Sequence, residues 1–156
     1  MVPTNLYGPN DCYSLDSSHV VAALIRRASE LADGEPLTVW GSGQPLRQFC
    51  YAPDLALLLL WVTFESVHLA EPLPLLSETE HSIADLARCV ASEFGDRQVL
   101  FDCSKADGQA RKCMSSADLR GLLRNFEFTS LEEGIRLTVA DYKVKKGEYR
   151  HGAAKL

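Results

Sequence analysis

The stretch LDSSHVVAALIRR (residues 15–27) predicts the start of an amphipathic helix, with Ser17 or Ser18 as its N-cap. At about 100° per residue, most apolar side chains between residues 20 and 31 share one arc of roughly 140°. His19 falls outside that apolar stripe. It therefore faces either solvent or a ligand, and the local pattern leaves both open.

Composition places the chain among globular proteins and sets limits on its function. It has 156 residues, 46% of them hydrophobic and 24% charged, and a net charge of -5, which argues against a nucleic-acid partner. The longest apolar run, residues 55–64, is too short to span a bilayer of about 30 Å. Five cysteines without C-x-x-C spacing favour a reducing compartment and no structural metal. With no signal peptide visible, we expect a cytoplasmic protein without a membrane partner.

Strand and helix patterns alternate along the chain, which indicates a mixed α and β fold. The first 16 residues look like a strand end passing into a loop, so we expect a piece of a longer protein. The predicted elements are helices over 18–32, 53–69, 82–94, 116–123 and 130–146, strands over 37–40, 47–52, 72–76 and 98–102, and a loop over 105–112. Pro53 is expected in the first turn of the second helix, and Ser82, with Asp85 three residues on, is expected to cap the third.

Two polar features lie near the start of the chain. PTNLYGP (residues 3–9) lets the backbone approach a flat ring, although a simple turn explains the same residues. His19 and Arg27 lie about 12 Å apart along one helix. This spacing is compatible with a sugar near His19 and a diphosphate near Arg27. A solvated helix face is the alternative.

Two further polar features follow. In TVWGSGQPLRQF (residues 38–49), Trp40 suits stacking on a ligand and Arg47 suits a phosphate, or else the stretch is a β-turn with a core tryptophan. In SKADGQARK (residues 104–112), Asp107 either accepts hydrogen bonds from sugar hydroxyls or simply marks a turn before Gly108.

Taken together, the order and spacing of these features resemble a known family. PTNLYGPND, SSHVVAALIRR, LTVWGSGQPLRQF, PDLA and DCSKADGQARK are similar to segments of the C-terminal half of the GDP-L-fucose synthases. These are epimerase/reductases of the extended short-chain dehydrogenase/reductase group. The resemblance covers at least residues 3–142.

The resemblance implies a fold class and a domain division. We expect an α/β fold that is the C-terminal substrate-binding part of an extended NAD(P)-binding Rossmann-type protein, with most of the Rossmann sheet absent. Residues 1–16 would end the cofactor-domain segment on its nicotinamide side. Residues 17–156 would form a GDP-sugar-binding domain.

The resemblance also assigns roles to individual positions. It makes His19 the proton donor of epimerisation, bordering the cofactor, a role that suits histidine near neutral pH. The cofactor would be NADP (NADPH), bound mostly by the absent N-terminal half. The segment at its nicotinamide end is Pro3, Thr4, Asn5 and Leu6, and the residues that hold the GDP-sugar are Arg27, Trp40, Arg47 and Asp107.

Departures from the family pattern limit what the chain does alone. It has no Gly-rich turn, and its one Tyr-x-x-x-Lys (Tyr142 to Lys146) lies in the final helix, where we interpret it as a coincidence. None of its cysteines matches the family's catalytic one, and residues 75–82 look shortened. We therefore expect no catalytic activity from the chain alone.

The family implies that the complete enzyme converts GDP-4-keto-6-deoxy-D-mannose to GDP-L-fucose by 3,5-epimerisation and NADPH-dependent reduction. It also implies a homodimer formed through the absent half. Two alternatives stay open. One is a non-catalytic short form that binds a GDP-sugar or a partner, and the other is a related nucleotide-sugar epimerase or dehydratase.

Overall fold

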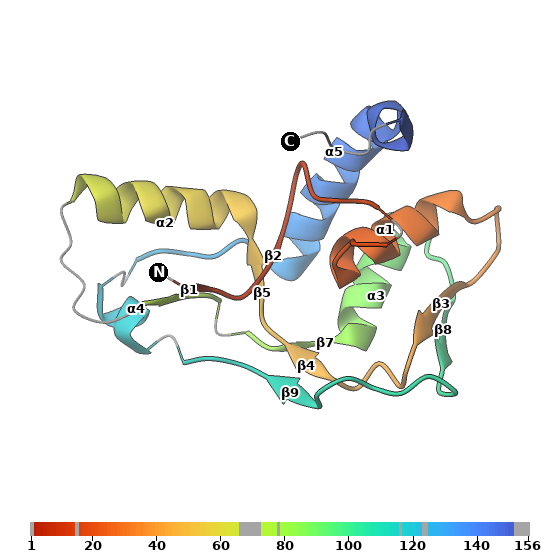
Figure 1. The fold of residues 1–156 in the computed structure, drawn as a ribbon, viewed down its shortest axis with the longest axis horizontal. Helices are drawn as coiled ribbons and strands as arrows, with labels where there is room; N and C mark the ends of the chain where they lie inside the picture. Colours follow the sequence, from red (N-terminus) through yellow and green to blue (C-terminus); the bar gives the residue numbers. More distant parts are fainter. Residues whose placement is uncertain are drawn as a thin grey trace.

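The computed structural model describes residues 2–14, 16–65, 73–77, 79–115, 117–122 and 125–151. Helices and strands alternate along the chain (Figure 1). They are β1 (Val2–Pro3), β2 (Asn5–Tyr7), α1 (Val20–Glu30), β3 (Leu37–Trp40), β4 (Leu46–Arg47), β5 (Phe49–Tyr51), α2 (Ala52–Phe64), β6 (Pro74–Leu75), β7 (His81–Ser82), α3 (Ile83–Ser92), β8 (Val99–Asp102), β9 (Arg111–Lys112), α4 (Ala117–Leu122) and α5 (Leu131–His151).

The larger apolar cluster lies where α1, α3 and α5 pack together beside β3 and β8 (Figure 1). α1 contributes the stripe predicted for it, with Val21, Leu24, Ile25 and Ala28 all buried. α3 begins at a capping box between Ser82 and Asp85, as its sequence predicts. The Ser82 hydroxyl accepts from the Asp85 N–H, and the Asp85 carboxylate accepts from the Ser82 N–H. We call this part of the molecule the three-helix body.

A smaller cluster lies on the other side of the molecule, between α2, β6 and α4 (Figure 1). Leu58 of α2 is buried there against Leu75 and Leu119. The same helix leaves Leu57, Leu60 and Phe64 exposed, so only part of an apolar helix is covered. Within the described residues, no helix combines the length and apolarity needed to cross a membrane.

The strands form short sheets, and this corrects the expected fold class. The α/β part of that expectation is confirmed. Three separate parallel pairs, β1–β6, β2–β5 and β3–β8, extend from residue 2 to residue 102, and a three-stranded sheet holds β7, β4 and β9 in that order. Parallel pairing of the kind found in nucleotide-binding folds is therefore spread along the chain. This parallel pairing was not predicted from the sequence, because the chain lacks the Gly-rich turn that is typical of nucleotide-binding folds.

Several element boundaries also differ from the predictions. The N-cap of α1 is His19 rather than Ser17 or Ser18, because Ser18 is still in a turn in which its N–H donates to Ser14 O at 3.1 Å. Arg111–Lys112 pairs as a strand where a loop was predicted. The predicted helix start at residue 116 and the continuation of the second helix over 66–69 lie outside the described residues.

Candidate functional site

The carboxyl ends of β3 and β8 lie side by side, because the two strands are parallel and pair Trp40 with Asp102. The chain leaves this edge through two loops that are joined by Asp107. Its carboxylate accepts hydrogen bonds from the Ser42 N–H at 2.8 Å and the Ser42 hydroxyl at 2.6 Å. These bonds hold the pKa of Asp107 below its usual value of 3.8. Gly41 has a φ of +84°, and a Cβ there would collide with the Asp107 carboxylate.

Arg27 and Trp40 meet beside this edge. The guanidinium of Arg27 lies 5.4 Å from the centre of the Trp40 ring and donates to Thr38 O at 2.8 Å. Trp40 is 64% exposed, so the core-tryptophan alternative is wrong. The pair presents a flat aromatic face with a cation beside it, which suits a nucleobase bearing phosphate groups.

A row of three basic residues crosses the sheet formed by β7, β4 and β9. Arg47 pairs with His81 on one neighbouring strand and with Lys112 on the other. Residues paired in register point to the same face, and neighbouring strands lie about 4.8 Å apart. Arg47 also lies close to Gly108, the residue after Asp107. The row therefore offers the adjacent positive charges of Arg47 and Lys112 to an anion, next to the loop that carries Asp107.

His19 is exposed at the start of α1 and makes no side-chain capping bond. Asp11 lies near enough for the charge of His19 to affect it. Burial raises the pKa of Asp11, against the lowering effects of the Cys12 N–H bond at 2.7 Å and of His19. Within the described residues, no hydrogen bond or ion pair joins the side chain of His19 to Arg27, Trp40, Arg47 or Asp107.

The segment predicted to border a nicotinamide, Pro3 to Leu6, spans the junction of β1 and β2. The Asn5 amide donates to Gln48 O at 2.8 Å, which ties β2 to the chain between β4 and β5. The Thr4 hydroxyl is buried and has no hydrogen-bond partner in the described part of the chain. A buried hydroxyl without a partner is rare in folded proteins, which distinguishes Thr4 within this segment.

The Tyr-x-x-x-Lys of the final helix has a structural role. The Tyr142 hydroxyl lies 2.9 Å from the Ser29 hydroxyl, and the Lys146 ammonium donates to Ser29 O at 2.9 Å. Both residues therefore connect α5 to α1. This agrees with the interpretation of the motif as a coincidence.

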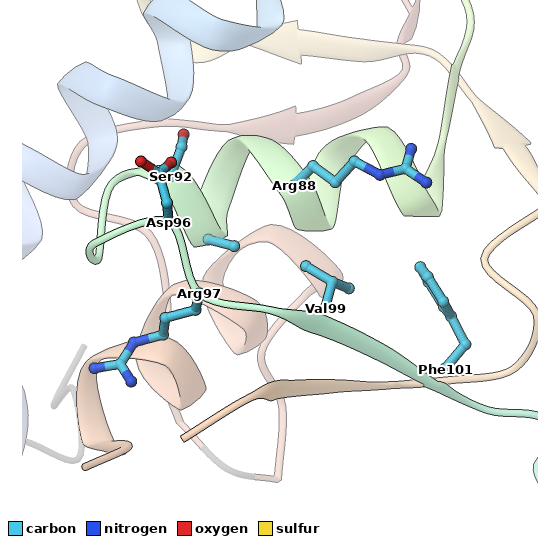
Figure 2. A pocket seen from close by; sticks show the side chains of 7 residues that line it. Arg88, Ser92, Asp96, Arg97, Val99 and Phe101 are labelled. Atoms are coloured by element: carbon cyan, nitrogen blue, oxygen red, sulfur yellow. The ribbon is translucent and has the colours of Figure 1, made fainter. Parts of the chain in front are cut away.

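Two cavities of the structure are lined by residues other than the predicted ones. The first, about 290 Å³, lies between α3 and β8 (Figure 2). In it Arg88 and Arg97 point away from each other, Arg88 pairs with Asp85 at 3.1 Å, and Arg97 donates to carbonyls at the end of α1. The second, about 250 Å³, lies by the start of α5 and is lined by Tyr7, Phe49 and His81 among others. Trp40 and Asp107, by contrast, lie exposed on the surface.

The structure brings some of the predicted residues together and adds two that the sequence did not single out. Arg27 lies against Trp40, and Asp107 bonds to the loop directly after Trp40. Lys112 and His81 enter only through strand pairing with Arg47, for which two-residue strands give no local signal.

The chain is similar in sequence and in structure to known proteins. Residues 1–70 match the model of the NAD dependent epimerase/dehydratase family. The chain is 40% identical to "GDP-L-fucose synthase" of Dictyostelium discoideum, over 87% of this chain and 43% of that protein, and 35% identical to that of Escherichia coli strain K12, over 96% and 50%. The solved "gdp-l-fucose synthetase from Naegleria fowleri bound to NADP" superposes with a TM-score of 0.85 at 35% identity, covering 94% of this chain and 47% of that one.

These matches show how much of its relatives the chain covers. It spans about half the length of the curated relatives that it matches. The match of residues 1–70 to an NAD-dependent family contradicts the fold class expected from the sequence, that of a substrate-binding part lacking most of the nucleotide-binding fold. The predicted division at residues 16 and 17 is not tested by these matches and stays a prediction.

Proposed function

Because the chain is a homologue of GDP-L-fucose synthase over about half the length of those proteins, we propose that it supplies the GDP-sugar-binding surface of such an enzyme. The observation that carries this proposal is the joint placement of Arg27 on Trp40 and of Arg47 beside Lys112. An exposed indole suits a purine base, and adjacent guanidinium and ammonium groups suit a diphosphate.

In this proposal each predicted residue has a physical task. Trp40 stacks on the guanine, with Arg27 held at the ring by its bond to Thr38 O. Arg47 and Lys112 bind the diphosphate. Asp107 uses both carboxylate oxygens on Ser42, and because a carboxylate offers about four acceptor positions it also accepts from a sugar hydroxyl.

The proposed reaction of the complete enzyme is epimerisation at C3 and C5 of the 4-keto sugar, followed by reduction at C4. His19, exposed at the start of α1, returns a proton to the sugar. The cofactor, NADPH in this proposal, supplies the hydride when bound. The buried Thr4 hydroxyl, together with Pro3, Asn5 and Leu6, forms the edge that meets its nicotinamide end. No turnover is expected from this chain alone, because it contains neither a Gly-rich turn nor a suitably placed Tyr-x-x-x-Lys.

A second candidate function is a non-catalytic short form that binds a partner. The exposed Leu57, Leu60 and Phe64 of α2 favour it, since a patch of large apolar side chains on a surface is typical of an interaction site. Recovery of a full-length relative together with the tagged chain would support this alternative.

The proposal is tested by calorimetric titration of the purified chain with GDP. We expect saturable binding, weaker binding of UDP, and a loss of about 10- to 100-fold in affinity in Arg47→Ala, the equivalent of about 1.5–3 kcal/mol for a hydrogen bond to a charged group. Arg136→Ala removes an exposed arginine that pairs with Glu133 on α5, and it serves as the matched control. Failure of the folded, unaltered chain to bind GDP would overturn the proposal.

A further inference from the structure

Residues 103–115 form an exposed strap across the candidate site. Every residue in it is exposed, so apolar burial does not hold it in place. Yet the strap carries Asp107 and Lys112, two residues that the proposed function requires at fixed positions. Backbone pairing of β9 with β4 fixes the part around Lys112, and side-chain contacts fix the rest.

Side chains of Ser42, Glu80 and Gln48, from elsewhere in the fold, anchor the strap. Ser42 holds Asp107, and Glu80 holds Arg111 through two bonds of 3.0 Å. In both of these anchors the group on the strap, Asp107 or Arg111, is exposed, and polar pairs with an exposed member contribute little to stability. The third anchor is different, because it involves Gln48, which is only 3% exposed.

Gln48 binds Met114 as a neighbouring strand would. Its side-chain nitrogen donates to Met114 O at 3.1 Å, and its side-chain oxygen accepts from the Met114 N–H at 2.8 Å. A buried amide side chain supplies one donor and one acceptor together, and a carboxylate or a methyl group cannot. Its backbone oxygen also accepts from Asn5, so the anchor connects to β2.

We propose that Gln48 is a positioning residue of the diphosphate site, which it serves by clamping Met114 and so holding Lys112 beside Arg47. Met114 lies two residues after Lys112, and Gln48 lies directly after Arg47. The clamp therefore fixes the two strands just beyond the pair of cations. This role rests on the proposed function, because it assumes that the pair binds a diphosphate.

The first measurement is amide hydrogen exchange of the whole chain without ligand. In Gln48→Met, which removes both bonds at similar volume, we expect residues 109–115 to exchange about tenfold faster while α3 and α5 stay as protected as before. Glu80→Gln, which weakens the exposed anchor, is the matched control and should change this exchange much less. Gln48→Glu, which keeps the acceptor for the Met114 N–H, provides a second variant should Gln48→Met fail to fold. Unchanged exchange in both Gln48 variants would overturn the proposal.

The second measurement compares GDP binding with guanosine binding, and it distinguishes a positioning role of Gln48 from a general contribution to stability. Gln48→Met should weaken GDP binding by about fivefold or more and lower its salt dependence, yet leave guanosine binding unchanged, because only the diphosphate loses a partner. Equal losses for GDP and guanosine would show a merely structural role and overturn the proposal. A variant that binds GDP like the unaltered chain would overturn this role alone, whereas an unaltered chain that does not bind GDP would overturn the proposed function as well.

Discussion

The three-helix body and the α2 side of the molecule contain similar residues but bury them to different extents. In the body, Ile25, Ile135 and Val90 are fully buried between three helices. On the other side α2 is apolar nearly all round, and it buries Leu58 while Leu57 and Leu60 stay exposed. A helix that is apolar on every face is typical of a buried position. The contrast teaches that the body completes its own packing, whereas α2 is packed on one face only.

The largest expected effect tests this contrast directly. Ile25→Ala removes a fully buried side chain from the body, and we expect a loss of about 2–5 kcal/mol in the free energy of unfolding. Leu60→Ala, on the exposed face of α2, should change it by less than about 0.5 kcal/mol. Urea unfolding of both variants measures this. Similar losses in the two variants would show that α2 is packed as tightly in solution as the body.

A smaller effect is expected where the two regions are joined. Asp54 near the start of α2 is buried and accepts from the Thr129 N–H at 2.8 Å and the Thr129 hydroxyl at 2.9 Å, just ahead of α5. Asp54→Ala leaves those donors without this acceptor, and we expect a loss of about 1.5–3 kcal/mol in unfolding free energy.

Thermal unfolding of Asp54→Ala, Thr129→Val and the double variant checks this, with exposed Asp33→Ala as the control. The two single changes should be strongly non-additive, because they remove the same contact. Additive losses would mean that Asp54 does not connect the two regions.

The smallest effect concerns a region held by polar contacts alone. Because Ser42 lowers the pKa of Asp107, the stabilisation from this contact is fully present above the usual carboxyl pKa of 3.8 and is lost as the pH falls through the lowered value. Ser42→Ala should return the Asp107 pKa toward 3.8 and remove that pH dependence. An NMR titration of the Asp107 carboxyl follows the change, and an unaltered pKa would exclude Ser42 as its cause.

Short sequence patterns were enough to predict most elements of the three-helix body, but they predicted only part of the candidate site. The apolar stripe of α1, the Ser82–Asp85 cap and the β3 and β8 patterns all lie within short windows of sequence, and the structure confirms them. The first-turn position of Pro53 in α2 is confirmed as well. The N-cap of α1 was misplaced, because two serines precede His19 and the turn around Ser18 delays the helix.

The site depends on pairing between distant segments, which a single sequence does not reveal. Resemblance identified Arg27, Trp40, Arg47 and Asp107, and the contact between the first two follows from one helix and the strand after it. The pairing of Arg47 with Lys112 and His81 has no periodic signal, since β4, β7 and β9 are two residues long. The clamp between Gln48 and Met114 was missed for the same reason.

The strap also has a consequence for the order in which the protein folds. Ser42 and Asp107 are 65 residues apart in the sequence, and Gln48 and Met114 are 66 apart. Contacts of such separation close large loops and form more slowly than the local contacts of a helix. We therefore expect refolding to recover helical circular dichroism first and the order of residues 103–115 last. During that interval the chain has its core and lacks its binding surface.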